Sequence, residues 1–321
     1  MSTIERVAEL LGPIERPSVN LFARSEGGIS ELNPIERAVS GRVEPTGFPD
    51  AEQLAAQLAI PSFADESRAR TRSEHPARKT TRTFKVDRER LRWQSMITPD
   101  DARTPSAESF RRIKRQILAN VAKSKADAPA NLVLVTSALM GEGKTFCAIN
   151  LAISIALEMD RTVLLVDADV AKPSVPRAFG LEATQGLMDV LLDRRIDLAE
   201  VMWKTDIGKL TLLPAGMAPQ HATELLASDA MRGLLQEMAE RYHDRIIIFD
   251  SPPLLAASEA GVLASQMGQI VMVVEAGKTS EATLKAALGR VESSNVAGLL
   301  LNKVEGAGQG YYYGGYGKGT K

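Results

Sequence analysis

The stretch from Asn131 to Phe146 reads NLVLVTSALMGEGKTF and contains three successive patterns. Leu132–Val135 is an apolar run rich in β-branched residues, which predicts one buried strand. Thr136–Gly143 has no periodicity, and apolar residues at helical spacing begin near Lys144. A strand, a glycine-bearing loop and a helix in this order are the setting that a phosphate-binding loop requires.

The residue types of this loop fit that chemistry. Gly141 and Gly143 allow backbone N–H groups to turn towards an anion, and the N-terminus of the following helix adds partial positive charge. We expect Lys144 to reach the β- and γ-phosphates and the Thr145 hydroxyl to take one Mg²⁺ position. The bland alternative is an ordinary turn between a strand and a helix.

Length and composition limit the class of protein. A chain of 321 residues can hold one large α/β domain and additional segments, and an apolar content of 44% fits a soluble globular protein. A net charge of −1 predicts no nucleic-acid binding, and the single cysteine, Cys147, indicates a reducing compartment. We find neither a signal-peptide pattern nor a long apolar span, so we expect a cytoplasmic protein that reaches the inner membrane through a partner.

Residues 1–95 do not have the pattern of a packed domain. Thr3–Leu11 is typical of a short amphipathic helix, and Arg68–Arg92 holds ten Lys or Arg against three acidic residues. Such a basic run predicts a solvated, flexible linker, with a nucleic-acid arm or an acidic-lipid contact as alternatives. We therefore divide the chain into an N-terminal region (1–95), a P-loop domain (96–304) and a tail (305–321).

The domain alternates strand and helix patterns. The expected strands are Leu132–Val135, Thr162–Val166, Leu210–Leu213, Arg245–Phe249, Ile270–Val274 and Val296–Leu301. The expected crossover helices are Lys144–Glu158, Thr223–Tyr242 and Ser280–Ser294. This alternation predicts an α/β fold with a doubly wound, mostly parallel sheet. Ligands of such sheets bind at the carboxyl ends of the strands.

Two expected strands end in carboxylates at that edge. VLLVDADVAKP places Asp167 and Asp169 after one strand, and IIIFDSPP places Asp250 after another. Mg²⁺ binds hard oxygen ligands and keeps several waters, so aspartates beside a phosphate loop suit it. The alternative for each aspartate alone is a helix N-cap or a loop turn.

The last seventeen residues have an unusual composition. Four of the five tyrosines of the chain lie in the last eleven residues, at Tyr311, Tyr312, Tyr313 and Tyr316, among many glycines. We expect no regular structure there, and roughly ten flexible residues span about 16–19 Å from the sheet edge. A phenolic hydroxyl near a bound nucleotide is a phosphoryl acceptor. The alternative is a low-complexity end without a role.

Together these segments resemble the bacterial tyrosine kinases, a P-loop family unrelated in fold to eukaryotic protein kinases. SALMGEGKT is similar to their Walker A motif, VLLVDADVAKP to their Walker A′ motif and IIIFDSPP to their Walker B motif. The tyrosine cluster is similar to their autophosphorylated tail. The resemblance covers residues 96–321, and MSTIERVAELL is similar to the branch encoded with exosortase-type exopolysaccharide systems.

The resemblance implies an ATP-dependent protein-tyrosine autokinase of MinD/ParA-like fold that uses Mg²⁺. The catalytic residues that it implies are Lys144, Asp167, Asp169 and Asp250. The implied nucleotide-binding residues are Met140, Gly141, Glu142, Gly143, Lys144, Thr145, Phe146 and Asn302, the last at the adenine ring. The implied metal ligands are Thr145, Asp167 and Asp250, the last through water. Asp167 is the candidate to orient the tyrosine hydroxyl or accept its proton, while Asp169 tunes the metal and the loop.

The resemblance also implies partners. Glu108, Arg111 and Lys114 fit the E-x-x-R-x-x-[RK] helix, which the resemblance assigns to self-association. We expect a head-to-tail ring with transfer between subunits, and transfer within one chain is the alternative. Family members need a transmembrane adaptor of the chain-length-determinant type, and a cognate tyrosine phosphatase is expected. The role implied for the whole is regulation of exopolysaccharide synthesis or export.

Some positions depart from the family pattern. The first glycine of G-x-x-x-x-G-K-[ST] is absent, since Ser137 or Ala138 stands there, Met140 replaces a common proline, and Ala171-Lys172-Pro173 replaces an arginine–proline arrangement. The related cell-division and plasmid-partition ATPases carry an early loop lysine where Leu139 stands, which argues against them. A nucleotide-dependent assembly switch without kinase activity remains the alternative function.

Overall fold

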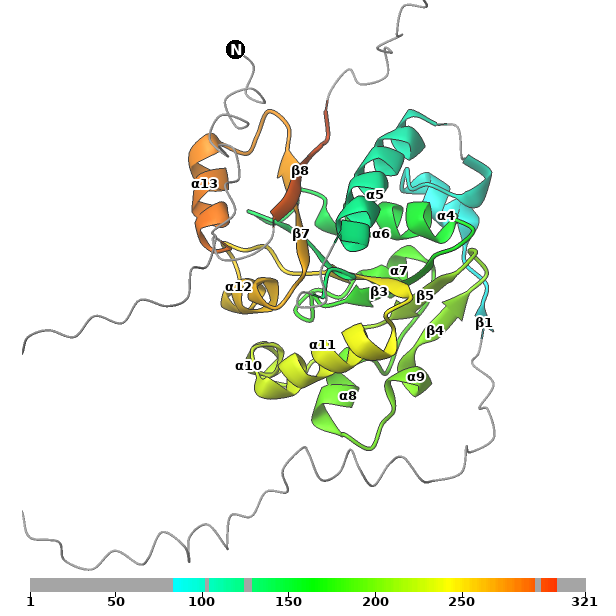
Figure 1. Ribbon diagram of the computed structural model, residues 1–321, viewed down its shortest axis with the longest axis vertical. Coiled ribbons are helices and arrows are strands. Elements are labelled where there is room, and N and C mark those ends of the chain that lie inside the picture. The colour runs from blue at the N-terminus through cyan, green and yellow to red at the C-terminus, as the bar shows by residue number, and fades with distance from the viewer. Residues whose placement is uncertain (1–82, 102–103, 124–128, 292–295, 305–321) are drawn as a thin grey trace, which may run out of the picture. The chain divides into compact units, whose positions relative to one another are not determined.

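The computed structural model describes residues 83–101, 104–123, 129–291 and 296–304 (Figure 1). All of them belong to one packed unit, residues 76–321. The helix expected at Thr3–Leu11 and the four tail tyrosines lie outside the described residues. Within the described ranges, we find no helix long and apolar enough to cross a bilayer.

An eight-stranded sheet forms the centre of this unit, with the strand order β1-β4-β5-β3-β6-β2-β7-β8. Its strands are β1 (Thr83–Phe84), β2 (Leu132–Ser137), β3 (Thr162–Asp167), β4 (Trp203–Thr205), β5 (Leu210–Leu213), β6 (Arg245–Asp250), β7 (Gln269–Glu275) and β8 (Val296–Asn302). Every neighbouring pair is parallel except β4 and β5. The predicted α/β, mostly parallel fold is therefore confirmed.

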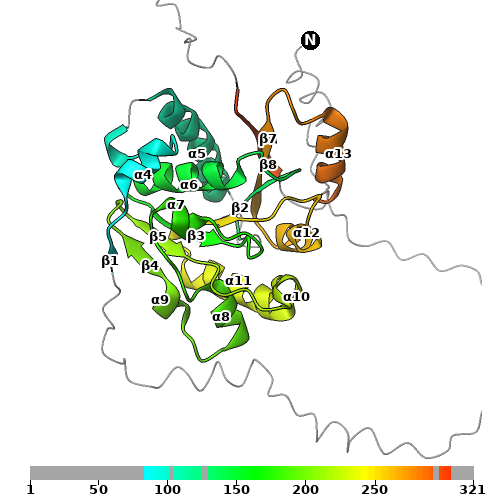
Figure 2. The ribbon, with the colours of Figure 1, turned by 180° about the vertical axis from the view of Figure 1, so that it is seen from behind.

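Helices cover both faces of the sheet (Figures 1 and 2). One face carries α4 (Arg88–Trp93), α5 (Pro105–Lys123), α6 (Lys144–Ala156) and α7 (Val175–Ala178). The other carries α8 (Leu187–Leu192), α9 (Leu198–Val201), α10 (Ala222–Leu226), α11 (Asp229–Arg241), α12 (Ser258–Ser265) and α13 (Glu281–Gly289). A short 3-10 helix, Pro99–Asp101, precedes α5.

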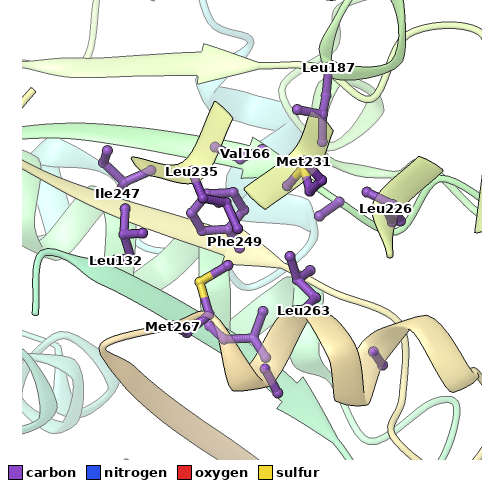
Figure 3. Close-up of a cluster of buried hydrophobic side chains, with 14 of the residues drawn as sticks. Leu132, Val166, Leu187, Leu226, Met231, Leu235, Ile247, Phe249, Leu263 and Met267 are labelled. Atoms are coloured by element: carbon purple, nitrogen blue, oxygen red, sulfur yellow. The ribbon is translucent and has the colours of Figure 1, made fainter. Parts of the chain in front are cut away.

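The central strands are buried on both faces, so they read as continuous apolar runs. In β2, Val133 and Val135 pack against the α6 side, whereas Leu132 and Leu134 pack against the α11 side. Figure 3 shows this second core, in which Phe249 of β6 is surrounded by side chains that include Leu235 and Met267. Phe249 is fully buried, and loss of such a ring typically costs about 3–5 kcal/mol.

The six expected strands occur where the apolar runs predicted them, and most extend by one or two residues. The expected helix at Thr223–Tyr242 is instead two helices, α10 and α11. Ser228 separates them, because its hydroxyl donates to the carbonyl oxygen of Leu225 at 2.7 Å and accepts the N–H of Met231 at 3.3 Å. A helix cap therefore interrupts a pattern that is periodic throughout.

Packing begins before the expected boundary between residues 95 and 96. The N-terminal strap (residues 83–98) adds β1 to the sheet edge, and the ring of Phe84 stacks on Trp203 with centroids 4.5 Å apart. Leu91 is fully buried, and the N–H of Ile97 donates to Oδ1 of Asn150 in α6 at 2.7 Å. The linker expectation therefore does not hold for the strap, where basic residues flank one deeply buried leucine.

Candidate active site

The phosphate loop (residues 138–143) joins β2 to the first turn of α6. Gly141 and Gly143 have φ angles of 86° and 96°, in the left-handed region that favours glycine. A Cβ at Gly143 would also lie 2.1 Å from Nδ2 of Asn302, so this position has no room for a side chain. No side chain caps the start of α6, which leaves its first N–H groups to an anion.

The missing first glycine is replaced by small, fully buried side chains. Ser137 and Ala138 are each 0% exposed, and the Ser137 hydroxyl donates to the carbonyl oxygen of Leu139 at 2.7 Å. The loop thus turns immediately after β2 without a glycine at that point.

Glu142 is turned into the protein. Its side chain is buried, with Oε2 accepting the N–H of Leu139 at 2.7 Å and Oε1 accepting the hydroxyl of Thr279. Nδ2 of Asn302 donates to the Glu142 carbonyl oxygen at 2.8 Å. The end of β8 therefore meets the phosphate loop, as the parallel topology predicts. A contact between Asn302 and adenine stays a prediction.

Lys144 is paired within the site. Its ammonium lies 2.6 Å from Oδ2 of Asp169, and both side chains are largely buried, at 13% and 7% exposed. Asp169 Oδ1 accepts the N–H of Lys172 at 3.2 Å, which closes the turn after β3. The lysine that the sequence assigns to phosphate thus has a carboxylate partner from the Walker A′ segment.

Asp167 and Asp250 are neighbours at the carboxyl ends of β3 and β6, where they are paired in register. Asp167 Oδ2 accepts the N–H groups of Ser174 and Val175, each at 2.9 Å. Oδ1 of Asp167 and both carboxylate oxygens of Asp250 are buried without a hydrogen-bond partner among the described residues. Three carboxylate oxygens are therefore unsatisfied at one point of the sheet edge.

Burial dominates the electrostatics of this pair. It raises the pKa of Asp167 to about 7, with the charge of Asp250 as the next cause. It raises the pKa of Asp250 to about 6, against the opposing effects of the Lys144 charge and of the nearby Thr145 hydroxyl, whose contact with Asp250 falls short of hydrogen-bond geometry. Ionised carboxylates here are costly unless a cation or a proton donor approaches.

The residues fit a bound Mg²⁺ ion. Unsatisfied buried oxygens of Asp167 and Asp250 lie beside the first turn of α6, and Thr145 Oγ1 lies 3.3 Å from the hydroxyl of Ser174. No cluster of three or more His, Cys, Asp or Glu with metal-binding geometry occurs in the described part of the chain. A partial protein shell is what Mg²⁺ uses when waters and substrate phosphates complete its coordination.

A cleft of about 560 Å³ opens over this edge. Met140, which is 60% exposed, stands at its rim, and Lys172 Nζ lies 4.0 Å from the Met140 sulfur. The lining residues include Gly141, Lys144, Asp169, Ser174, Pro252 and Glu259. The cleft gives solvent access to the Lys144–Asp169 pair.

Comparison with known proteins identifies the family. The sequence profile of the AAA domain family matches residues 132–294. Tyrosine-protein kinase YwqD of Bacillus subtilis is 33% identical over 213 residues, which cover 65% of this chain and 86% of that protein. This chain belongs to the bacterial tyrosine kinases.

Two further comparisons agree. Tyrosine-protein kinase ptk of Acinetobacter johnsonii is 27% identical over 268 residues, which cover 83% of this kinase and 34% of that protein. The kinase domain of the Escherichia coli tyrosine kinase ETK superposes with a TM-score of 0.59 at 26% identity. That superposition covers 84% of this kinase and 100% of the ETK domain.

Phe146 and the α5 residues of the kinase lie in different surroundings from Lys144, Asp167 and Asp250. The ring of Phe146 packs edge-on to Phe110 of α5 with centroids 6.3 Å apart, so its partly buried side chain packs against the core. Lys114 is also buried, donating to the Ser154 carbonyl oxygen at 3.1 Å and pairing with Glu158. The ammonium of Lys114 is thus bonded to α6 within the chain.

Glu108 and Arg111 pair with each other at 2.7 Å and are partly exposed. The assignment of Glu108, Arg111 and Lys114 to self-association stays a prediction, as does the acceptor role of the tail tyrosines.

Sequence reasoning missed three residues of the site. Ser174 reaches Thr145, Thr279 bonds Glu142, and Lys303 Nζ donates to the Gly141 carbonyl oxygen at 2.7 Å. Each lies just after an expected strand or Walker segment on the ligand side of the sheet. Their place directly after these segments was the one sign in the sequence that they could belong to the site. Their hydrogen-bond partners lie 29 to 162 residues away in the sequence, so no local pattern identifies them.

Proposed function

We propose that this kinase transfers the γ-phosphoryl group of ATP to tyrosines of its own tail, with Mg²⁺, in the control of exopolysaccharide synthesis or export. The observation that supports this most is the group of three unsatisfied oxygens of Asp167 and Asp250 beside a preformed phosphate loop. Such a site suits a metal-bound triphosphate and a hydroxyl that must lose a proton.

The loop and Lys144 bind the triphosphate. The N–H groups at the start of α6 and in the phosphate loop donate to the phosphate oxygens. The ammonium of Lys144 leaves its ion pair with Asp169 and pairs with the β- and γ-phosphates instead. Thr145 and Asp250 are the proposed metal ligands, with Asp167 close by. The Mg²⁺ ion supplies charge neutralisation of the phosphates.

Asp167 is the proposed general base, which accepts the proton of the tyrosine hydroxyl. The tyrosine oxygen forms the new P–O bond, the bond to the β-phosphate breaks, and the phenolic proton passes to Asp167 Oδ1. Ser174 and Val175 hold the other oxygen in place at 2.9 Å, which fixes the carboxylate orientation. A carboxylate whose pKa is raised to about 7 is a stronger base than a solvent-exposed aspartate.

The acceptors that we propose are Tyr311, Tyr312, Tyr313 and Tyr316. Support comes from β8, whose last residue, Asn302, contacts the phosphate loop at 2.8 Å. The tail therefore starts close to the nucleotide site. We propose transfer between chains of a ring-shaped oligomer, because the tail must otherwise reverse sharply to reach its own site.

The proposed partners follow from the family. They are further copies of this chain, a transmembrane adaptor of the chain-length-determinant type and a tyrosine phosphatase. Through the adaptor the kinase acts at the cytoplasmic side of the inner membrane. Nucleic acid is not a proposed partner.

Replacing the four tail tyrosines with Phe tests the acceptor assignment. We expect tandem mass spectrometry to find phosphotyrosine in the tail of wild type after Mg-ATP and none in the variant. Nucleotide binding by the variant should equal that of wild type. Phosphate found mainly at Tyr242, which is 7% exposed, or on Ser and Thr would contradict the assignment. Nucleotide-dependent assembly without any phosphotyrosine would favour the alternative function, an assembly switch without kinase activity.

A mixing experiment tests transfer between chains. It combines a Lys144→Met chain that keeps its tail with an active chain whose tail has been removed. Transfer between chains predicts phosphate on the Lys144→Met tail, at a rate that rises with protein concentration. Normal labelling of wild type at a concentration-independent rate, with none on the Lys144→Met tail, would show an intramolecular reaction.

A further inference from the structure

Asn302, the last residue of β8, and Lys303, which follows it, both contact the phosphate loop. Asn302 Nδ2 donates to the carbonyl oxygen of Glu142 at 2.8 Å, and Lys303 Nζ donates to that of Gly141 at 2.7 Å. We call this pair, Asn302 and Lys303, the β8 brace. Two successive loop carbonyls are thus held on the side of β8 by residues more than 150 positions away in sequence.

Holding these carbonyls orients the N–H groups that bind an anion. In a planar trans peptide the C=O and N–H groups point in opposite directions. Lys303 fixes the peptide between Gly141 and Glu142, and Asn302 fixes the next one, between Glu142 and Gly143. The N–H groups of Glu142 and Gly143 therefore point away from the brace, and their reversal would place carbonyl dipoles towards phosphate.

Lys303 is itself held in a strained conformation. Its φ angle is 57°, in the left-handed region that a non-glycine residue occupies only where its surroundings hold it. The ammonium also pairs with Oε2 of Glu275 at 3.2 Å. Burial works to raise the pKa of Glu275, but bonds from Lys303 and Lys278 outweigh it and lower the pKa. The carboxylate anchor therefore stays charged at neutral pH.

We propose that Asn302 and Lys303 are positioning residues that set the phosphate-loop amides before the nucleotide binds. This inference rests on the proposed function, because it assumes that the loop binds ATP. It gives Asn302 a role that does not depend on the adenine ring. It also gives Lys303, which no motif includes, a part in nucleotide affinity that acts through the loop.

Lys303→Met tests the brace, because it keeps the aliphatic stem and backbone strain but removes the donor. Lys303→Arg keeps a cationic donor. Lys278→Met is the matched control, since Lys278 pairs with the same Glu275 at 3.4 Å, and no hydrogen bond or ion pair joins its side chain to the loop among the described residues. The measurements are calorimetric affinity for a magnesium complex of a non-hydrolysable ATP analogue, KM for ATP, and the rate at saturating ATP.

We expect Lys303→Met to bind the analogue about tenfold more weakly, with a matching rise in KM and a smaller change in the saturated rate. Lys303→Arg should recover most of the affinity, and Lys278→Met should match wild type. Wild-type affinity in Lys303→Met, or an equal loss in Lys278→Met, would overturn the inference while leaving the proposed function intact. A wild-type chain that binds no nucleotide would overturn the proposed function itself.

Discussion

The carboxylates of Asp167 and Asp250 place function and stability in conflict at single residues. Oδ1 of Asp167 and both carboxylate oxygens of Asp250 lack a hydrogen-bond partner among the described residues, and burial raises the pKa of both side chains. A group whose pKa is raised on folding favours the folded state when protonated, so its contribution is lost as pH rises through the folded pKa. In the absence of nucleotide and metal, these aspartates therefore destabilise the fold at neutral and alkaline pH.

We predict that Asp250→Asn stabilises the ligand-free protein while it slows phosphorylation. A neutral isostere removes a buried charge, which should raise stability by about 1–3 kcal/mol at pH 8. In a chelator-containing buffer, the Tm difference from wild type should shrink as pH falls from about 8 to about 5, below the raised pKa of about 6. Addition of Mg-ATP should stabilise wild type more than the variant. A lower Tm for the ligand-free variant at pH 8 would mark Asp250 as a structural residue.

Residue by residue, the motifs predicted the centre of the site and missed its supports. Lys144, Asp167 and Asp250 were predictable because strand ends and a loop glycine pattern are local signals. Lys303 and Thr279 were not, since each acts on a loop residue 162 or 137 positions away. The assignment of Glu142 to nucleotide binding stays a prediction. Its carboxylate bonds Leu139 and Thr279, which no pattern in GEGKT indicates.

Among the strands, the buried central ones were predicted correctly and the short ones at the sheet edge were missed. The central strands are apolar throughout because helices cover both faces, so the sequence marks them clearly. β1 has two residues and β4 three, which is too short for any periodicity, and β4 joins the sheet antiparallel to β5. Both lie at one edge of the sheet, and β1 belongs to the N-terminal strap, which overlaps the basic run that predicted a linker.

The contact between α5 and α6 lets a role of Lys114 within one chain be tested against a role between subunits. Its side chain is 7% exposed, and it bonds the carbonyl oxygen of Ser154 and the carboxylate of Glu158 near the end of α6. Lys114→Met should lower the free energy of unfolding of a single domain by about 1–3 kcal/mol. The exposed Arg115→Met on the same helix should change it by less than about 0.5 kcal/mol.

Denaturant unfolding and analytical ultracentrifugation together decide the point. If Lys114 acts mainly between subunits, Lys114→Met would dissociate oligomers while monomer stability stays at the wild-type value. That outcome would contradict the intramolecular role seen in the structure.

For the whole molecule, the parallel topology brings distant segments to one edge. β2, β3, β6 and β8 end together, which places the phosphate loop, both Walker aspartates and Asn302 within one site. The sequence predicted this gathering because parallel strands share their carboxyl edge. The ring of subunits that the resemblance implies stays a prediction, because contacts between subunits depend on surfaces that no periodic pattern describes.

The central claim is that this edge phosphorylates tyrosine, and Lys144→Met tests it most directly. The variant removes the cation at the loop and retains the tail. Wild type and variant are purified free of other kinases and incubated with Mg-ATP. Phosphotyrosine is then quantified by tandem mass spectrometry. We predict modified tail tyrosines in wild type and at least about a hundredfold less in Lys144→Met, as expected for loss of an electrostatic contact to the transferred phosphate. Equal phosphotyrosine in both proteins would contradict the assignment of this loop as the catalytic site.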